Sequence, residues 1–117
     1  MFERLAEVVN ADPAIVRWGR EMHGTFMLEV GAAQYLVTVR AGRIDRVERG
    51  PFVMRSWRFA IRASEECWSQ FLRSPPAPGW QDLFALLRRG EVAFDGDQRV
   101  LWAYLLYLKL ALERLRR

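Results

Sequence analysis

The sequence has little of the side-chain chemistry from which most active sites and metal sites are built. Its single cysteine, Cys67, allows no intramolecular disulfide and no cysteine-based metal site. Cys67 lies in an apolar pattern between Glu66 and Trp68, which favours a small core residue over a nucleophile. The only histidine, His23, would have to serve any Ser–His or Cys–His pair, and beside Gly24 it is expected to be solvated or to cap a helix. We therefore expect no enzyme, no catalytic residue, no metal and no cofactor.

The chain also lacks a basic block and an apolar run of membrane-spanning length. All but one of the 18 basic residues are arginine and the net charge is +4, but the arginines alternate with acidic and apolar residues, as in 43–49. This alternation favours a solvated strand over a nucleic-acid surface. The apolar stretch 100–112 is shorter than the roughly 20 residues that cross a bilayer, so we expect peripheral membrane contact at most. The first residues carry Glu3 and Glu7, unlike a signal peptide, and a cytoplasmic location is expected.

Apolar and aromatic residues are plentiful. The 117 residues are 51% hydrophobic and include five Trp, seven Phe and three Tyr. A chain of this length forms one domain, expected over residues 1–117, and buries roughly 65% of its unfolded surface. Rings in this number suit a thick core or the wall of a hydrophobic cavity.

Hydrophobic periodicity predicts a mixed succession of helices and strands. Helices are expected over residues 2–10, 13–22, 65–72, 80–89 and 100–112, and strands over 25–30, 34–40, 43–49, 57–63 and 91–95. The first four strands follow one another as an antiparallel series. The sequence thus predicts an α+β fold, with a five-stranded, mainly antiparallel sheet and helices on one face.

Two expectations concern which side chains point inward. In the strand 57–63, alternation places Trp57, Phe59, Ile61 and Ala63 on the buried face and Arg58 and Arg62 on the solvent face. In the helix 13–22, Ile15, Val16 and Trp18 are expected to face the core.

The last helix is apolar on two sides, and Lys109 is its only charge between residues 100 and 112. One stripe at helical spacing comprises Leu101, Tyr104, Leu105, Leu108 and Leu112, and the opposite side carries Trp102, Leu106, Tyr107 and Leu110. A surface helix needs only one such stripe. The second side is therefore expected to be covered by another layer of the fold, a partner chain or a bound apolar molecule.

The order of these elements resembles that of the sterol carrier protein-2 (SCP-2) family. The residues that carry the resemblance best are Leu86–Leu87, Gly90, Val92, Phe94, Gly96 and Asp97, in the pattern LLxxGxVxFxGD, followed by Leu101, Leu105 and Leu108. The hairpin from Tyr35–Leu36–Val37 through Gly42 to Ile44 is a weaker match. None of these residues is catalytic.

The resemblance implies a hydrophobic tunnel between the sheet and the helices, in which a fatty acyl chain, a sterol or a similar lipid can lie. The implied walls are Phe26, Leu28, Tyr35, Val37, Trp57, Phe59 and Ile61 from the sheet, and Leu101, Trp102, Leu105 and Leu108 from the last helix. The first hypothesis is non-enzymatic binding or presentation of a lipid, fatty acyl, sterol-like or isoprenoid ligand. The alternative is an accessory module with a filled core, which dimerises or joins a biosynthetic complex through Leu106, Tyr107 and Leu110.

Overall fold

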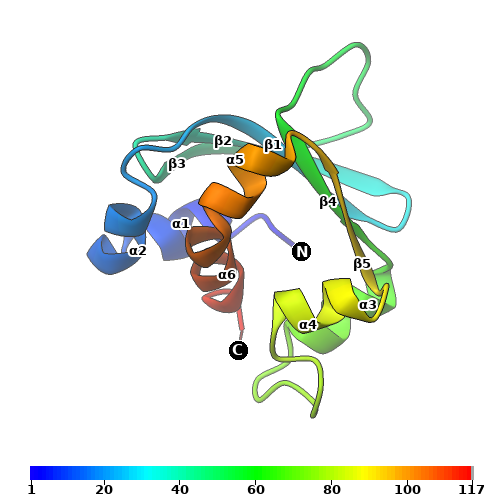
Figure 1. The fold of residues 1–117 in the computed structure, drawn as a ribbon. Coiled ribbons are helices and arrows are strands. Elements are labelled where there is room, and N and C mark those ends of the chain that lie inside the picture. Colours follow the sequence, from blue (N-terminus) through cyan, green and yellow to red (C-terminus); the bar gives the residue numbers. More distant parts are fainter. Residues whose placement is uncertain (117) are drawn as a thin grey trace.

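The structure is a computed structural model that describes residues 1–116 (Figure 1). The helices are α1 (Leu5–Asn10), α2 (Pro13–Trp18), α3 (Glu65–Phe71), α4 (Leu83–Arg88), α5 (Gln98–Ala103) and α6 (Leu105–Glu113). The strands are β1 (His23–Val30), β2 (Ala33–Arg40), β3 (Arg43–Arg49), β4 (Phe59–Ala63) and β5 (Val92–Gly96). Across residues 1–116, no helix has the length and hydropathy needed to cross a bilayer.

The five strands form one sheet in the order β3-β2-β1-β4-β5, which confirms the predicted α+β architecture. All neighbours are antiparallel except β1 and β4, which run parallel with Leu28 opposite Ile61. The expected antiparallel series is therefore wrong at its fourth strand. The charged strand β3 suits the sheet edge. Strand β1 buries the consecutive residues 26–28, so it needs both faces covered and takes the centre.

The helices lie on one face of this sheet (Figure 1). Helix α1 packs against β3, α2 and α6, α4 lies beside β5, and α5 rests on β4. A large apolar core fills the space between the two layers. The other face of the sheet carries a small cluster of Met27, Leu36 and Ala60, against which Phe52 and Trp57 pack.

Side-chain caps fix the beginnings of several helices. Asp12 accepts hydrogen bonds from the amides of residues 14 and 15, Ser64 accepts from that of Cys67, and Asp97 accepts from those of residues 99 and 100. Each satisfies amides that have no partner within the helix. The expected extension of α2 to residue 22 is wrong, because the helix ends at Trp18. This indole, expected to face the core, is 57% exposed.

The predicted C-terminal helix is interrupted. At Tyr104 the backbone takes φ −112° and ψ 21°, outside the helical range, and this residue separates α5 from α6. Neither proline nor glycine stands at the break, and nothing in the local sequence explains it. The break lets α5 rest on β4 while α6 packs against α1 and α2.

Candidate functional site

The layer between the sheet and α5–α6 contains most of the residues predicted to bind an apolar ligand. Phe26 on β1 and Phe59 on β4 stack with ring centroids 5.1 Å apart and an interplanar angle of 6°. This contact is possible because β1 and β4 are neighbours in the sheet. Leu101 from α5 and Leu108 from α6 are buried in the same core cluster.

These side chains have almost no surface that water can reach. The exposed fraction is 0% for Leu28, Val37, Phe59, Ile61 and Leu101, and at most 3% for Phe26, Tyr35 and Leu108. A side chain with no accessible surface has no water-sized space beside it. The layer is therefore filled in this conformation, and its role as a ligand site stays a prediction.

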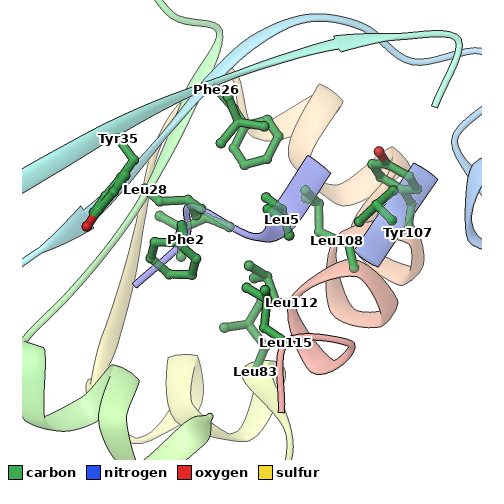
Figure 2. Close-up of a cluster of buried hydrophobic side chains, with 14 of the residues drawn as sticks. Phe2, Leu5, Phe26, Leu28, Tyr35, Leu83, Tyr107, Leu108, Leu112 and Leu115 are labelled. Atoms are coloured by element: carbon green, nitrogen blue, oxygen red, sulfur yellow. The ribbon is translucent and has the colours of Figure 1, made fainter. Parts of the chain in front are cut away.

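The N-terminal segment fills the middle of this layer. Figure 2 shows Phe2 and Leu5 pointing into the space between the sheet and α6. The ring of Phe2 makes edge contacts with Tyr35 at 5.4 Å and with Trp68, on α3, at 5.1 Å. The sequence predicted a helix over residues 2–10, whereas α1 begins at Leu5, and periodicity did not indicate which part of the core this segment would cover.

Trp57 is not a wall of this layer. It precedes β4, so strand alternation does not extend to it, and it packs on the opposite sheet face with Met27, Leu36 and Ala60. The prediction that Trp57 shares a face with Phe59 is therefore wrong.

The predicted register of β4 itself is confirmed. Phe59 and Ile61 are fully buried, while Arg58 is exposed and Arg62 is half-buried on the other face. The guanidinium of Arg62 donates to Glu29 and, over 3.2 Å, to Asp95.

Helix α5 carries an aromatic cluster where the core meets the surface. Trp102 is 44% exposed, and its ring makes edge contacts with Phe84 on α4 at 5.7 Å and with Phe94 on β5 at 5.9 Å. Leu106, one turn further along, is 45% exposed, whereas Leu105 and Leu110 are half-buried. The outer surface of the C-terminal segment is thus apolar at Trp102 and Leu106.

Tyr107 does not belong to this outer surface, contrary to prediction. Its side chain is 1% exposed, and its phenol donates a 2.7 Å hydrogen bond to the carbonyl of Gly42. Burial raises the pKa of Tyr107, so the phenol stays protonated and keeps this bond at neutral pH. The break at Tyr104 changes which side of the helix faces inward, and periodicity alone could not reveal this.

Cys67 and His23, the two residues considered as catalytic candidates, both occupy positions that suit a structural role. Cys67 is 1% exposed, and burial raises its pKa to about 11, so it is a thiol near neutral pH. His23 accepts a 3.3 Å hydrogen bond at Nδ1 from the amide of Ala41, and this bond connects the two strands at the end of the β1–β2 pair.

Within residues 1–116 no group of three or more His, Cys, Asp or Glu side chains is placed to hold a metal ion. The layer offers hydrophobic contact, and no charged side chain among the described residues is buried in it.

Comparison with known proteins identifies the architecture. No protein-family model matches the chain, and the search of curated proteins gave no match. The crystal structure of a sterol carrier protein 2 superposes with a TM-score of 0.78 and 15% identity, over 97% of this chain and 91% of that one. This chain has the SCP-2 fold. At this level of identity, the similarity establishes the fold alone.

Two further SCP-2 structures have names that refer to a ligand or to a role of those proteins. The palmitated SCP2L2 protein of Aedes aegypti matches with a TM-score of 0.59 and 23% identity, over 94% of this chain and 86% of that one. The UbiJ-SCP2 ubiquinone synthesis protein matches with a TM-score of 0.61 and 18% identity, over 92% of this chain and 88% of that one. One name refers to a fatty acyl ligand and the other to a biosynthetic role.

Proposed function

We propose that this protein binds one apolar lipid molecule, without catalysing a reaction, between the sheet and helices α5 and α6. The observation that carries the proposal is the composition of this layer in an SCP-2 fold: side chains from both sides are apolar, and none that is buried is charged. A ligand there gains about 0.8 kcal/mol for each CH₂ group that leaves water. The ligand class is therefore a long fatty acyl, sterol-like or isoprenoid chain.

Entry of a ligand requires the filled layer to open, and two features favour this. The break at Tyr104 divides the covering segment, so α5 and α6 can move separately. The N-terminal segment that carries Phe2 is a short stretch before α1, and a ligand chain can take the place of its ring. We infer that the ligand enters beside the cluster of Trp102, Phe84 and Phe94, because Trp102 there reaches the surface.

Titration with a fluorescent fatty acid tests this proposal. We expect saturable binding with about one site per chain and micromolar affinity or better. The emission of Trp102 should change on binding, and Trp102→Phe serves as the control that separates its signal from that of the other tryptophans. Ala103→Trp, which enlarges the neighbouring side chain, should weaken binding. Absence of saturable binding would contradict the proposal.

A second candidate function, protein interaction, is favoured by the exposure of Trp102 and Leu106 beside a filled core. In this case the outer surface of α5 and α6 would contact a second copy or a member of a biosynthetic complex. Native mass spectrometry of protein purified from its host distinguishes the two candidates, because it reports both a co-purified lipid and the oligomer. A dimer without lipid, dissociated by Leu106→Asp, would support this second candidate over the first.

A further inference from the structure

An open hollow lies beside helix α2, at the outer edge of the helical layer. Figure 1 shows α2 in blue, on the other side of α6 from α3 and α4. The hollow has a volume of about 520 Å³ and is lined by Pro13, Ala14, Arg17, Trp18 and Arg20. Its apolar surface comes from the indole of Trp18, which is 57% exposed, and from the exposed side chains of Pro13 and Ala14. This surface is separate from the lipid layer proposed above.

The hollow also carries positive charge. Arg17 and Arg20 are exposed, and neither forms an ion pair with a carboxylate of residues 1–116. Nη1 of Arg20 donates a 3.1 Å hydrogen bond to the carbonyl of Arg17, which holds this guanidinium at the end of α2. Of the nearby acids, Asp12 pairs with Arg114 over 3.4 Å, and Glu21 does not line the hollow. A ligand here therefore meets two guanidinium groups that have no anionic partner among the described residues.

The backbone beneath the hollow is fixed by close packing. Gly19, within the lining segment, is buried against the ring of Tyr107, and an added Cβ would come within 2.6 Å of that ring. Gly42, in the β2–β3 turn, approaches the end of α2 so closely that an added Cβ would collide with the carbonyl oxygen of Val16. Because this backbone is already ordered, a partner that binds here does not have to order it.

We propose that this hollow binds a short acidic segment of a partner protein. A carboxylate of the segment accepts hydrogen bonds from the guanidinium groups of Arg17 and Arg20, whose planar geometry matches a carboxylate. An apolar side chain of the same segment covers the indole of Trp18. Tryptophan and arginine are the residue types that most often dominate the affinity of a protein interface.

The shape and charge of the hollow favour a peptide segment over other anions. Pockets for small molecules enclose most of their ligand, whereas this hollow is open and is lined by a single short segment of chain. A nucleic acid is held through many phosphate contacts, and two unpaired arginines supply few. The proposal does not depend on lipid binding, because α2 packs against α1 and α6, whereas the proposed ligand entry lies beside α4 and β5.

NMR titration of the ¹⁵N-labelled full chain tests the proposal. The probes are short synthetic peptides in which Asp or Glu alternates with Leu or Phe, and each has a control peptide with Asn or Gln in place of the acids. We expect saturable shifts of the indole N–H of Trp18 and of the amides of residues 14–20. The dissociation constant should be on the order of 100 μM or lower. The control peptides should bind at least about tenfold more weakly.

Matched variants test whether the hollow itself is responsible for peptide binding. Arg17→Gln/Arg20→Gln should weaken binding of the acidic peptides by at least about tenfold. Arg49→Gln/Arg99→Gln removes the same charge from two exposed arginines outside the hollow, and should bind within about twofold of the wild type. Trp18→Ala should weaken binding at least about fivefold. All five side chains are exposed, so the variants should fold normally, which their NMR spectra verify.

Several results would overturn the proposal. These are the absence of saturable binding by any acidic peptide, equal binding of the control peptides, and unchanged binding in Arg17→Gln/Arg20→Gln. Sodium phenylacetate, a single-stranded oligonucleotide and vesicles that contain phosphatidylglycerol are titrated in parallel. Tighter binding of one of these than of the peptides, lost in the same double variant, would assign the hollow to that class of ligand instead.

Discussion

The phenol of Tyr107 on α6 and the carbonyl of Gly42 in the β2–β3 turn are joined by a buried 2.7 Å hydrogen bond across 65 residues of sequence. Tyr107 also covers Gly19, where an added Cβ would come within 2.6 Å of the ring. One side chain thus ties the C-terminal helix to a hairpin turn and to the end of α2. The fit leaves no room for a larger residue at position 19.

Replacing Tyr107 by Phe should destabilise the fold by about 1–3 kcal/mol. The ring still fills its place, but the carbonyl of Gly42 loses the phenol as its buried partner, and an unsatisfied buried acceptor has a cost of this size. Urea denaturation of the wild type and Tyr107→Phe measures the difference. An unchanged midpoint and slope would mean that water replaces the phenol at no cost.

Leu108→Ala should lower the free energy of unfolding by about 2–5 kcal/mol, the usual cost of truncating a buried leucine. Leu105→Ala should cost less than about 2 kcal/mol, because Leu105 is only half-buried whereas Leu108 is 1% exposed. Both variants remove the same side-chain atoms from α6, so the denaturation curves report mainly the difference in burial. Equal costs would contradict this difference in packing.

Phe2→Ala should destabilise the protein by about 3–5 kcal/mol and raise its affinity for a fluorescent fatty acid. Phe2 is fully buried between Tyr35 and Trp68, and its removal leaves an apolar cavity in the proposed ligand layer. Denaturation gives the first quantity and probe titration the second. Phe71→Ala is the control, since it creates a cavity under α3 with no proposed role in ligand entry. Lower probe affinity in Phe2→Ala would show that the ring belongs to the ligand contact itself.

Stability should fall as the pH rises from 9 to about 11, partly because of Cys67. Burial raises the pKa of this thiol from 9.0 to about 11. The unfolded chain therefore loses the proton first, and the contribution that is complete below pH 9 disappears as the pH approaches 11. We expect a fall of about 2 kcal/mol from this group. Cys67→Ala should show a shallower decline between about pH 8 and pH 10, before the tyrosines titrate.

The sequence predicted the parts of the fold that depend on local patterns. Strict alternation gave the correct buried face of β4. Asp12, Ser64 and Asp97, which cap α2, α3 and α5, are residue types that favour a helix beginning. These signals reside in neighbouring residues, so one chain suffices to detect them. The five-stranded α+β arrangement followed from their order.

The wrong predictions share one physical origin, because each depends on where an element ends or on which other segment it packs against. Trp57 has the spacing of a β4 residue but stands before the strand begins, and Trp18 has helical spacing but ends its helix at the surface. Tyr107 is turned inward by a break at Tyr104 that no proline or glycine announces. The filling of the ligand layer by Phe2 likewise depends on where α1 docks. Periodicity specifies which side of an element is apolar and leaves the partner surface unspecified.

The parallel pairing of β1 with β4 also determines when the central strand can complete its pairing during synthesis. Until Ala63 has left the ribosome, β1 has only β2 beside it, and its other edge offers unpaired backbone groups. The hairpins of residues 23–49 can form early, but the central strand waits for a segment more than 30 residues downstream, as the Glu29–Arg62 contact across 33 residues shows. A fragment that ends at Arg49 therefore carries an open central strand, and we expect it to aggregate instead of folding.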